Sequence, residues 1–128
     1  MKEYKKNPDV KDVAEISFLK LVESLTSARQ SRITPISGVI EHVTVSWPRG
    51  CNFLVEVLFE HKRIQIIPYP TTGTTRGIAL DNFTETLRPN WPVQHGDLID
   101  MVLLNYDGTY DHTISAVMRI RETNDGIN

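Results

Sequence analysis

The chain has 128 residues, of which 40% are hydrophobic, enough for one sizeable core and too few for two. Fourteen Lys and Arg residues stand against sixteen Asp and Glu residues, a formal charge of −2. This balance excludes a general electrostatic footprint for nucleic acid and also a polyacidic, disordered chain. The charged fraction of 23% and the aromatic fraction of 8% are typical of a folded soluble domain.

The single cysteine, Cys51, has no partner for an intramolecular disulfide and offers no thiolate pair to a metal. No apolar stretch approaches the roughly 20 residues of a membrane-spanning helix, and the basic start of the chain has no apolar segment behind it. We therefore expect a cytoplasmic protein, or one assembled in the cytoplasm into a particle that later leaves the cell. We expect no membrane or nucleic-acid partner, no cofactor and no metal.

The first part of the chain, from Val10 to about Gln30, shows the spacing of an amphipathic helix. Its apolar residues recur every three or four positions, at Ala14, Phe18, Leu21, Val22, Leu25 and Ala28. Asn7-Pro8-Asp9 supplies a plausible helix start. Polar residues over 26–32, followed by Pro35 and Gly38, end the pattern. The sequence therefore predicts an N-terminal helical arm and linker over residues 1–34.

The predicted helix carries more apolar surface than a small domain usually covers, because Ile16 and Leu19 widen its stripe. We expect a docking or self-association face made by Phe18, Leu21, Val22 and Leu25. The alternative is that this same face packs against the chain's own sheet.

After Gly38 the apolar period changes from about 3.6 residues to 2, which indicates β-strands. The alternation predicts strands over 39–47, 53–59, 63–67, 77–81, 83–88, 97–105 and 112–121. Pro48-Arg49-Gly50 connects the first two, and His61-Lys62 makes a tight turn. Short strands with turn signals between them predict a two-layer antiparallel β-sandwich over residues 35–128, of jelly-roll or immunoglobulin-like type.

Carboxylates gather between residues 81 and 112, with Arg88 as the only cation there. Asp107 and its neighbours offer oxygen ligands to a cation such as calcium, but Asp107-Gly108 is also a strong hairpin turn, and we favour the turn. A pair of these acids would serve sugar hydrolysis, yet nothing in the sequence pairs them, so a solvated edge is favoured. Basic residues between 49 and 76 suggest surfaces of opposite charge, which suit head-to-tail or ring association.

The four histidines stand far apart in the sequence and are expected at the surface and in turns. Cys51 follows Gly50 at a predicted turn. A nucleophilic thiolate would need a base beside it, and no base is placed there by the sequence. We expect a structural, half-buried thiol.

Two loops are predicted as binding surfaces. Residues 67–77 begin with two prolines and are rich in hydroxyls, and residues 88–96 set Trp91 between prolines. A rigid aromatic ring stacks on a sugar or anchors a protein partner, so Tyr69 and Trp91 are the expected contact residues. The alternative for Trp91 is a cap over the open end of the sandwich.

Several short motifs follow one another between residues 38 and 121, namely Trp47-Pro48-Arg49-Gly50-Cys51, Leu54-Val55-Glu56-Val57, Gln65-Ile66-Ile67-Pro68, Leu80-Asp81-Asn82 and the segment from Asp107 to Ile114. In pattern and order they resemble small β-rich structural and accessory proteins of tailed phages and archaeal viruses. The resemblance implies a non-enzymatic virion component of decoration, spike or neck type, without catalytic residues to carry over.

We expect, from residues and resemblance together, a structural protein of the virion. It would form a homo-oligomer, contact other virion proteins and dock through its N-terminal helix. A carbohydrate-binding module that uses Trp91 and Tyr69 on a glycan is the alternative. A glycosidase-type enzyme is the third hypothesis. It ranks last because no nucleophile, base and orienting group can be named together.

Overall fold

The computed structural model describes residues 12–70 and 76–123. These residues form nine strands: β1 (Val13–Val22), β2 (Ser27–Ile33), β3 (Gly38–Trp47), β4 (Val55–His61), β5 (Ile64–Ile67), β6 (Phe83–Leu87), β7 (Trp91–Val93), β8 (Leu98–Asn105) and β9 (His112–Glu122). No helix is present among them.

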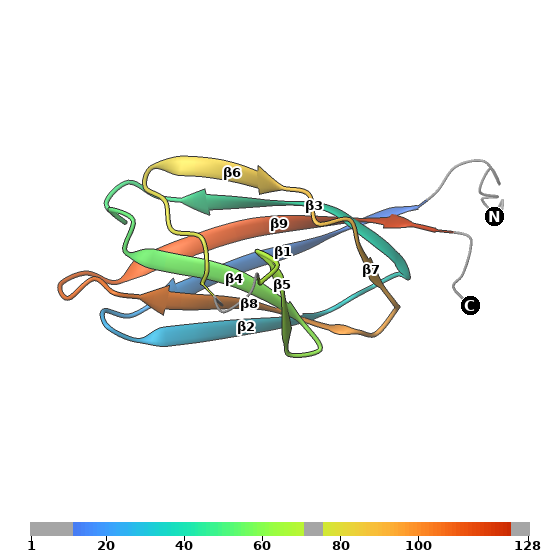
Figure 1. Cartoon of the computed structure of the whole chain (residues 1–128), viewed down its shortest axis with the longest axis horizontal. Helices are drawn as coiled ribbons and strands as arrows, with labels where there is room; N and C mark the ends of the chain where they lie inside the picture. The colour runs from blue at the N-terminus through green and yellow to red at the C-terminus, as the bar shows by residue number, and fades with distance from the viewer. Residues whose placement is uncertain (1–11, 71–75, 124–128) are drawn as a thin grey trace, which may run out of the picture.

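The strands make two antiparallel sheets that face one another (Figure 1). The five-stranded sheet has the order β1-β9-β3-β6, and β7 pairs with the first residues of β3. The four-stranded sheet has the order β2-β8-β4-β5. The predicted two-layer antiparallel arrangement is therefore confirmed, and the molecule is elongated along its strands.

The core lies between the sheets and follows from the alternation along each strand. In β9, Ile114, Ala116, Met118 and Ile120 are buried, whereas Thr113 before them and Val117 between them are exposed. Phe18 of β1 meets Phe59 of β4 edge to face across the two layers, with ring centroids 5.6 Å apart.

The predicted N-terminal helix is wrong. Residues 13–22 form β1, which pairs with β9 in unbroken register from Val13 opposite Arg121 to Val22 opposite His112. Ile16, Phe18 and Val22 point into the core at the period of a strand, whereas Leu19 and Leu21 lie on the outer face. Exposed Leu21, followed by exposed Leu25, supplied the three-and-four spacing of a helix, and exposed Leu19 widened its stripe. The proposed helix start at Asn7 lies outside the described residues.

The remaining segments of the predicted arm also join the sheets. Residues 27–33 form β2, which pairs with β8 from Ser27 opposite Leu104 to Ile33 opposite Leu98. At the edge where β1 and β2 meet, Gln30 accepts a hydrogen bond from the Leu19 amide (2.8 Å), and Arg32 donates to the Ser17 carbonyl (3.1 Å). Side chains thereby satisfy backbone groups that an edge strand otherwise leaves open.

Two expectations in the later part of the chain also change. The strand predicted over residues 77–81 is reduced to an isolated bridge, in which Ile78 pairs with Val57. The predicted hairpin turn at Asp107-Gly108 is wrong, because residues 106–111 connect β8 to β9 and these two strands belong to different sheets. In this loop the Asp107 carboxylate accepts hydrogen bonds from the amides of Thr109 (2.9 Å) and Tyr110 (3.2 Å).

Candidate functional site

The two predicted contact residues, Tyr69 and Trp91, lie side by side. Their ring centroids are 6.0 Å apart with an angle of 39° between the planes. Tyr69 is 67% exposed, whereas Trp91 is half-buried and packs on the core. We call this pair the aromatic platform. Trp91 thus packs on the core and still offers part of its ring beside Tyr69.

A hydrogen-bonded chain behind the platform fixes the Trp91 ring. The indole Nε1 of Trp91 donates to Nδ1 of His61 (3.0 Å), and Nε2 of His61 lies 2.8 Å from the Asp97 carboxylate. An indole nitrogen is only a donor, so Nδ1 of His61 must carry the lone pair. The neutral imidazole therefore carries its hydrogen on Nε2 and donates a hydrogen bond from there to the Asp97 carboxylate. The sequence offered no sign of this chain, because its members are up to 36 residues apart.

The Asp97 carboxylate is stabilised in its charged form. Burial raises its pKa, but the hydrogen bonds from the Gln94 amide and His61, together with the nearby Lys62 ammonium, outweigh burial and leave the pKa below its ordinary value. Lys62 lies 3.6 Å from the carboxylate. Asp97 is therefore an anchor for the imidazole rather than a proton donor near neutral pH.

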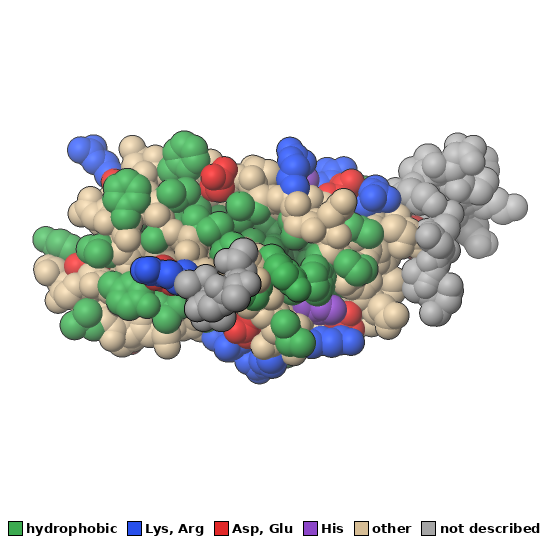
Figure 2. All heavy atoms as spheres, in the orientation of Figure 1, with side chains coloured by type: hydrophobic (Ala, Val, Ile, Leu, Met, Phe, Trp, Pro, Cys, Tyr) green, Lys and Arg blue, Asp and Glu red, His purple; other side chains and the backbone are tan. Residues whose placement is uncertain are grey.

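A second candidate surface lies at the end of the sandwich opposite residues 12 and 123. It is made by residues 23–26 between β1 and β2, 51–54 before β4, and 106–111 between β8 and β9, which we call the loop tip. Large apolar side chains protrude from it: Leu25, Phe53, Leu54, Tyr106 and Tyr110. Figure 2 shows hydrophobic side chains at this end of the molecule, where Figure 1 places the β1–β2 and β8–β9 connections. An exposed cluster of this kind is typical of an interaction surface.

Hydrogen bonds tie the three loops of the tip together. The amide of Tyr106 donates to the Leu54 carbonyl (2.8 Å), and the amide of Asn105 donates to the Thr26 carbonyl (2.9 Å). Ser24 binds the third loop twice, through its hydroxyl to the Asp107 carbonyl (2.7 Å) and through its amide to the Asp111 carboxylate (2.9 Å). The tip is thus braced before any partner arrives.

Two of the apolar side chains occupy positions that favour glycine. Leu25 has a φ of 56° and Phe53 a φ of 62°, in the left-handed region that bulky residues rarely adopt. Each sits third in a tight turn, closed by Thr26 N to Glu23 O (3.1 Å) and by Leu54 N to Cys51 O (2.9 Å). Leu25 is 68% and Phe53 65% exposed, so little burial offsets the backbone cost. Such strain is common at functional sites.

A pair made by His112, the first residue of β9, and Asp107 supports the loop tip from the core side. Nε2 of His112 lies 2.8 Å from the Asp107 carboxylate, and both side chains are largely buried. The hydrogen bond from His112 and the amides of Thr109 and Tyr110 lower the pKa of Asp107 against the opposing effect of burial. The carboxylate is therefore committed to holding the loop. Among the described residues no group of three or more His, Cys, Asp or Glu side chains could hold a metal ion.

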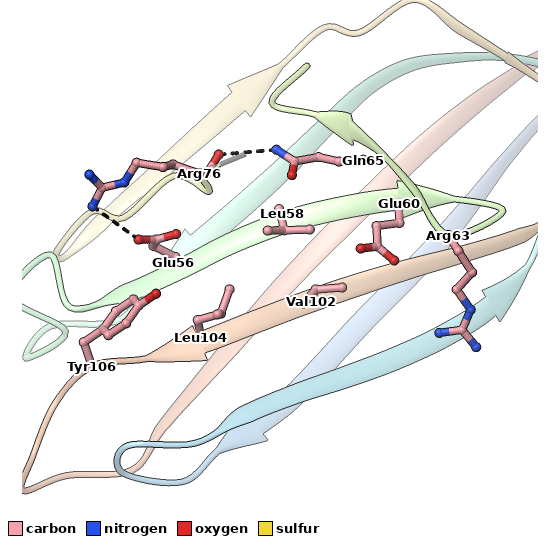
Figure 3. Close-up of a pocket in the computed structure, with 9 residues that line it drawn as sticks. All are labelled: Glu56, Leu58, Glu60, Arg63, Gln65, Arg76, Val102, Leu104 and Tyr106. Atoms are coloured by element: carbon pink, nitrogen blue, oxygen red, sulfur yellow. Dashed lines mark hydrogen bonds and ion pairs between the residues drawn. The ribbon is translucent and has the colours of Figure 1, made fainter. Parts of the chain in front are cut away.

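A groove of about 570 Å³ runs along the outer face of the four-stranded sheet (Figure 3). Leu58, Val102 and Leu104 form its apolar floor, and charged side chains line its rim. Figure 3 shows Arg76 reaching Glu56, 3.6 Å away, and the Gln65 amide donating to the Arg76 carbonyl (3.3 Å).

Beside this groove lies a fully buried carboxylate, Asp100. It accepts a hydrogen bond from Nη1 of Arg29 (2.7 Å), lies 3.4 Å from Nη1 of Arg63, and bonds the Ser31 hydroxyl. Arg29 also binds Glu60 (2.6 Å). These contacts pair the charges within the chain, so this network is structural.

The outer face of the five-stranded sheet carries a cluster of arginines near the terminal end. A bulge at Glu41 in β3 aims its carboxylate at Nε of Arg119 (3.2 Å) and of Arg121 (2.9 Å) on β9. The hydrogen bond from Arg121 is the main cause that lowers the pKa of Glu41. Arg88 lies beside them, exposed, and makes no hydrogen bond or ion pair with a described residue. We call Arg88, Arg119 and Arg121 the arginine face.

The acids and the thiol considered as reactive groups are held in structural contacts. Asp81 accepts hydrogen bonds from the amides of Gly50 (3.0 Å) and Asn52 (2.9 Å) and so shapes the loop before β4. Cys51 is fully buried rather than half-buried, and burial, with the nearby charges of Asp81 and Asp107, raises the pKa of its thiol to about 11. A thiol in that environment remains protonated.

The four residues predicted as one docking face are separated. Phe18 and Val22 are buried in the core, Leu21 lies exposed on β1, and Leu25 protrudes from the loop tip. Sequence reasoning missed Phe53 as a surface residue, because it completed the alternation of the following strand. The signal was Asn52, which tolerates the left-handed conformation and precedes Phe53 in the turn.

No family model matches the chain, and no curated protein matches it. Among solved structures, the chain is similar to a chain of the cyanophage Pam1 capsid asymmetric unit, with a TM-score of 0.55 and 10% identity over 96% of this chain and 94% of that one. This likeness shows that a known protein shares the fold over nearly its whole length.

Two further structures are more distant. One is FLHE, with a TM-score of 0.48 and 13% identity over 88% of this chain and 99% of that one. The other comes from disulfide-linked pili of Bacillus endospore appendages, with a TM-score of 0.45 and 11% identity over 96% of this chain and 100% of that one. No helix in the described part of the chain is long and apolar enough to cross a membrane.

Proposed function

We propose that the chain is a non-enzymatic structural component of a virus particle. The observation that carries the proposal is the shared fold with a chain of the Pam1 capsid asymmetric unit, which spans nearly all of both chains. The shared fold makes up almost the whole of that capsid chain and almost the whole of this one. A protein that consists of this fold is therefore suited to the same kind of task. The sequence resemblance to small virion proteins agrees with this choice.

The contacts of the acidic side chains support a non-enzymatic role. Asp81 and Asp111 accept backbone amides, Asp97 and Asp107 hold histidines, and Asp100 is buried among arginines. Each of these carboxylates therefore stabilises the sandwich or its loops. A general acid or base would need a carboxyl that faces a substrate and is free to exchange a proton.

Quantitative mass spectrometry of purified particles tests the proposal. We expect the chain to be present at a fixed ratio to the main shell protein and to survive repeated density-gradient purification. A chain found only in the unassembled fraction of the infected cell would contradict a structural role.

Glycan binding is the second candidate function, and the aromatic platform favours it. Two neighbouring rings, one exposed and one locked by His61, can stack on the apolar face of a sugar. A glycan array provides the test. Binding that is lost in Tyr69→Ala but kept in Tyr110→Ala, an equally exposed tyrosine on the loop tip, would support the platform. Absence of binding across the array would exclude it.

A further inference from the structure

The loop tip is shaped for contact with a protein. Its exposed apolar side chains stand on loops that are fixed by hydrogen bonds, so contact with a partner would not require the loops to become ordered first. Phe53 and Leu25 are held outward although their backbone conformation opposes bulky side chains. Fixed, exposed aromatic residues are the usual anchors of protein interfaces.

The charge of the tip indicates what kind of surface it meets. Glu23 and Asp111 are exposed on its loops, whereas Asp107 is buried against His112, and exposed Arg49 lies two residues before the segment 51–54, so the acids outnumber the base at this end. Carboxylates beside aromatic rings match a surface that presents arginine, because a guanidinium both pairs with a carboxylate and stacks on a ring. Acidic surfaces such as nucleic acid or anionic lipid are disfavoured by the same charges.

The chain itself carries such a surface. Arg88 and Arg119 of the arginine face line a shallow pocket of about 430 Å³ together with Glu41, His42 and Asn90. Glu41 is shared between Arg119 and Arg121, exposed Glu15 lies opposite Arg119 on β1, and Arg88 has no acidic partner among the described residues, so the three arginines outnumber these two carboxylates. Positively charged side chains are visible toward the terminal end in Figure 2.

The two surfaces lie at opposite ends of the long axis. β9 runs from the loop tip at His112 toward the terminal end at Glu122, with Arg119 and Arg121 near its finish (Figure 1). One copy therefore cannot join its own tip to its own arginine face. We propose that copies of this chain associate head to tail, the loop tip of one seated on the arginine face of the next. This inference rests on the proposed structural role and names the contact that such a role would use.

A head-to-tail contact joins two different surfaces, so each copy keeps one of them free after the first contact forms. Such contacts continue into rings or open chains rather than stopping at two copies. The contact should also weaken as salt rises, because its charged part lies at the surface.

Light scattering of the full chain over a range of protein concentration tests the proposal. Glu23→Lys and Arg88→Glu each change one exposed charge, and each single variant should weaken association about tenfold or more, since like charges then face each other. The double variant restores opposite charges and should recover association. Lys62→Glu is the matched control, because this exposed lysine lies in the turn between β4 and β5, away from the loop tip and the arginine face, and should leave association unchanged.

Phe53→Gly separates contact from folding. It removes the aromatic ring at a position where the backbone suits glycine, so the fold should persist while association falls by about tenfold or more. A monomer at every concentration, a mass that stops at two copies, or association unchanged in Phe53→Gly would overturn the proposal. A chain that is monomeric in solution but present in particles would refute this contact and leave the proposed function intact.

Discussion

Replacing Phe53 tests whether the loop tip holds a bulky side chain against its backbone preference. Phe53→Gly and Phe53→Ala both remove the ring, so the lost packing is nearly the same in the two variants. They differ in the backbone, because only alanine keeps a Cβ at a φ of 62°. We therefore compare the two variants with each other rather than with the native chain.

The expected difference follows from two opposing contributions. A left-handed conformation costs a residue with a Cβ roughly 1–2 kcal/mol, and glycine is spared this cost. Glycine in turn loses more backbone entropy on folding than alanine does, which lowers the stability of the glycine variant by about 0.4–1 kcal/mol. Phe53→Gly should then be more stable than Phe53→Ala by about 0.5–1 kcal/mol, or about 2–4 °C in Tm for a chain of this size.

Urea denaturation followed by tryptophan fluorescence measures this difference. Val117 provides the control, because it is an exposed apolar residue inside β9 with ordinary strand geometry. There the order should reverse, with Val117→Ala more stable than Val117→Gly by about 0.5–1 kcal/mol. If Phe53→Ala equals or exceeds Phe53→Gly in stability, the strain assigned to the tip is wrong.

Three further predictions concern the interior. The pKa of Asp97 and of Asp107 is lowered on folding, so the stability these carboxylates contribute is complete above about pH 4 and is lost as the pH falls through their folded values. In Asp107→Asn the free energy of unfolding should fall less steeply as the pH is lowered below about 4. A slope equal to that of the native chain would refute the pairing with His112. Arg29→Met should cost about 1–3 kcal/mol in chemical denaturation because buried Asp100 loses its closest arginine, whereas Arg76→Met should cost about 0.5 kcal/mol or less. Equal costs would show that burial does not matter here. Cys51, buried with a pKa of about 11, should resist thiol reagents at pH 8 until the chain unfolds, and rapid labelling of the folded chain would contradict its placement.

The sequence predicted the sheets best where alternation was clean. Residues 43–47 and 114–120 carry buried apolar residues at every second position, and they lie in β3 and β9 at the centre of the five-stranded sheet. Burial on one face of a strand imposes this period, so the strands could be recognised without their partners. The same reasoning could not place β7, whose three residues pair with β3 only because the chain folds back there.

β1 could not be recognised because its outer face is also apolar. Leu19 and Leu21 are exposed, yet in the sequence they look like members of a helical stripe. The ten-residue register with β9 decides the conformation, and that pairing joins segments about a hundred residues apart. The spacing of residues within β1 gives no information about a strand so far away in the sequence.

The candidate sites were predictable only in part. Tyr69 and Trp91 were singled out as rigid aromatics beside prolines, and the fold brings their rings together. His61, which locks Trp91, comes from the end of β4 and is found only by distance. The loop tip is made by three connections that are far apart in the sequence. They become neighbours only because the strands that carry them pair within the two sheets, and this pairing cannot be deduced from local sequence.

Cryo-electron microscopy of virus particles that carry this chain tests the central claim most directly. The account predicts copies of the sandwich at regular positions, with residues 51–54 and 106–111 of one copy against Arg88 and Arg119 of the next. Particles without density for the sandwich, or with copies whose loop tips touch nothing, would contradict it.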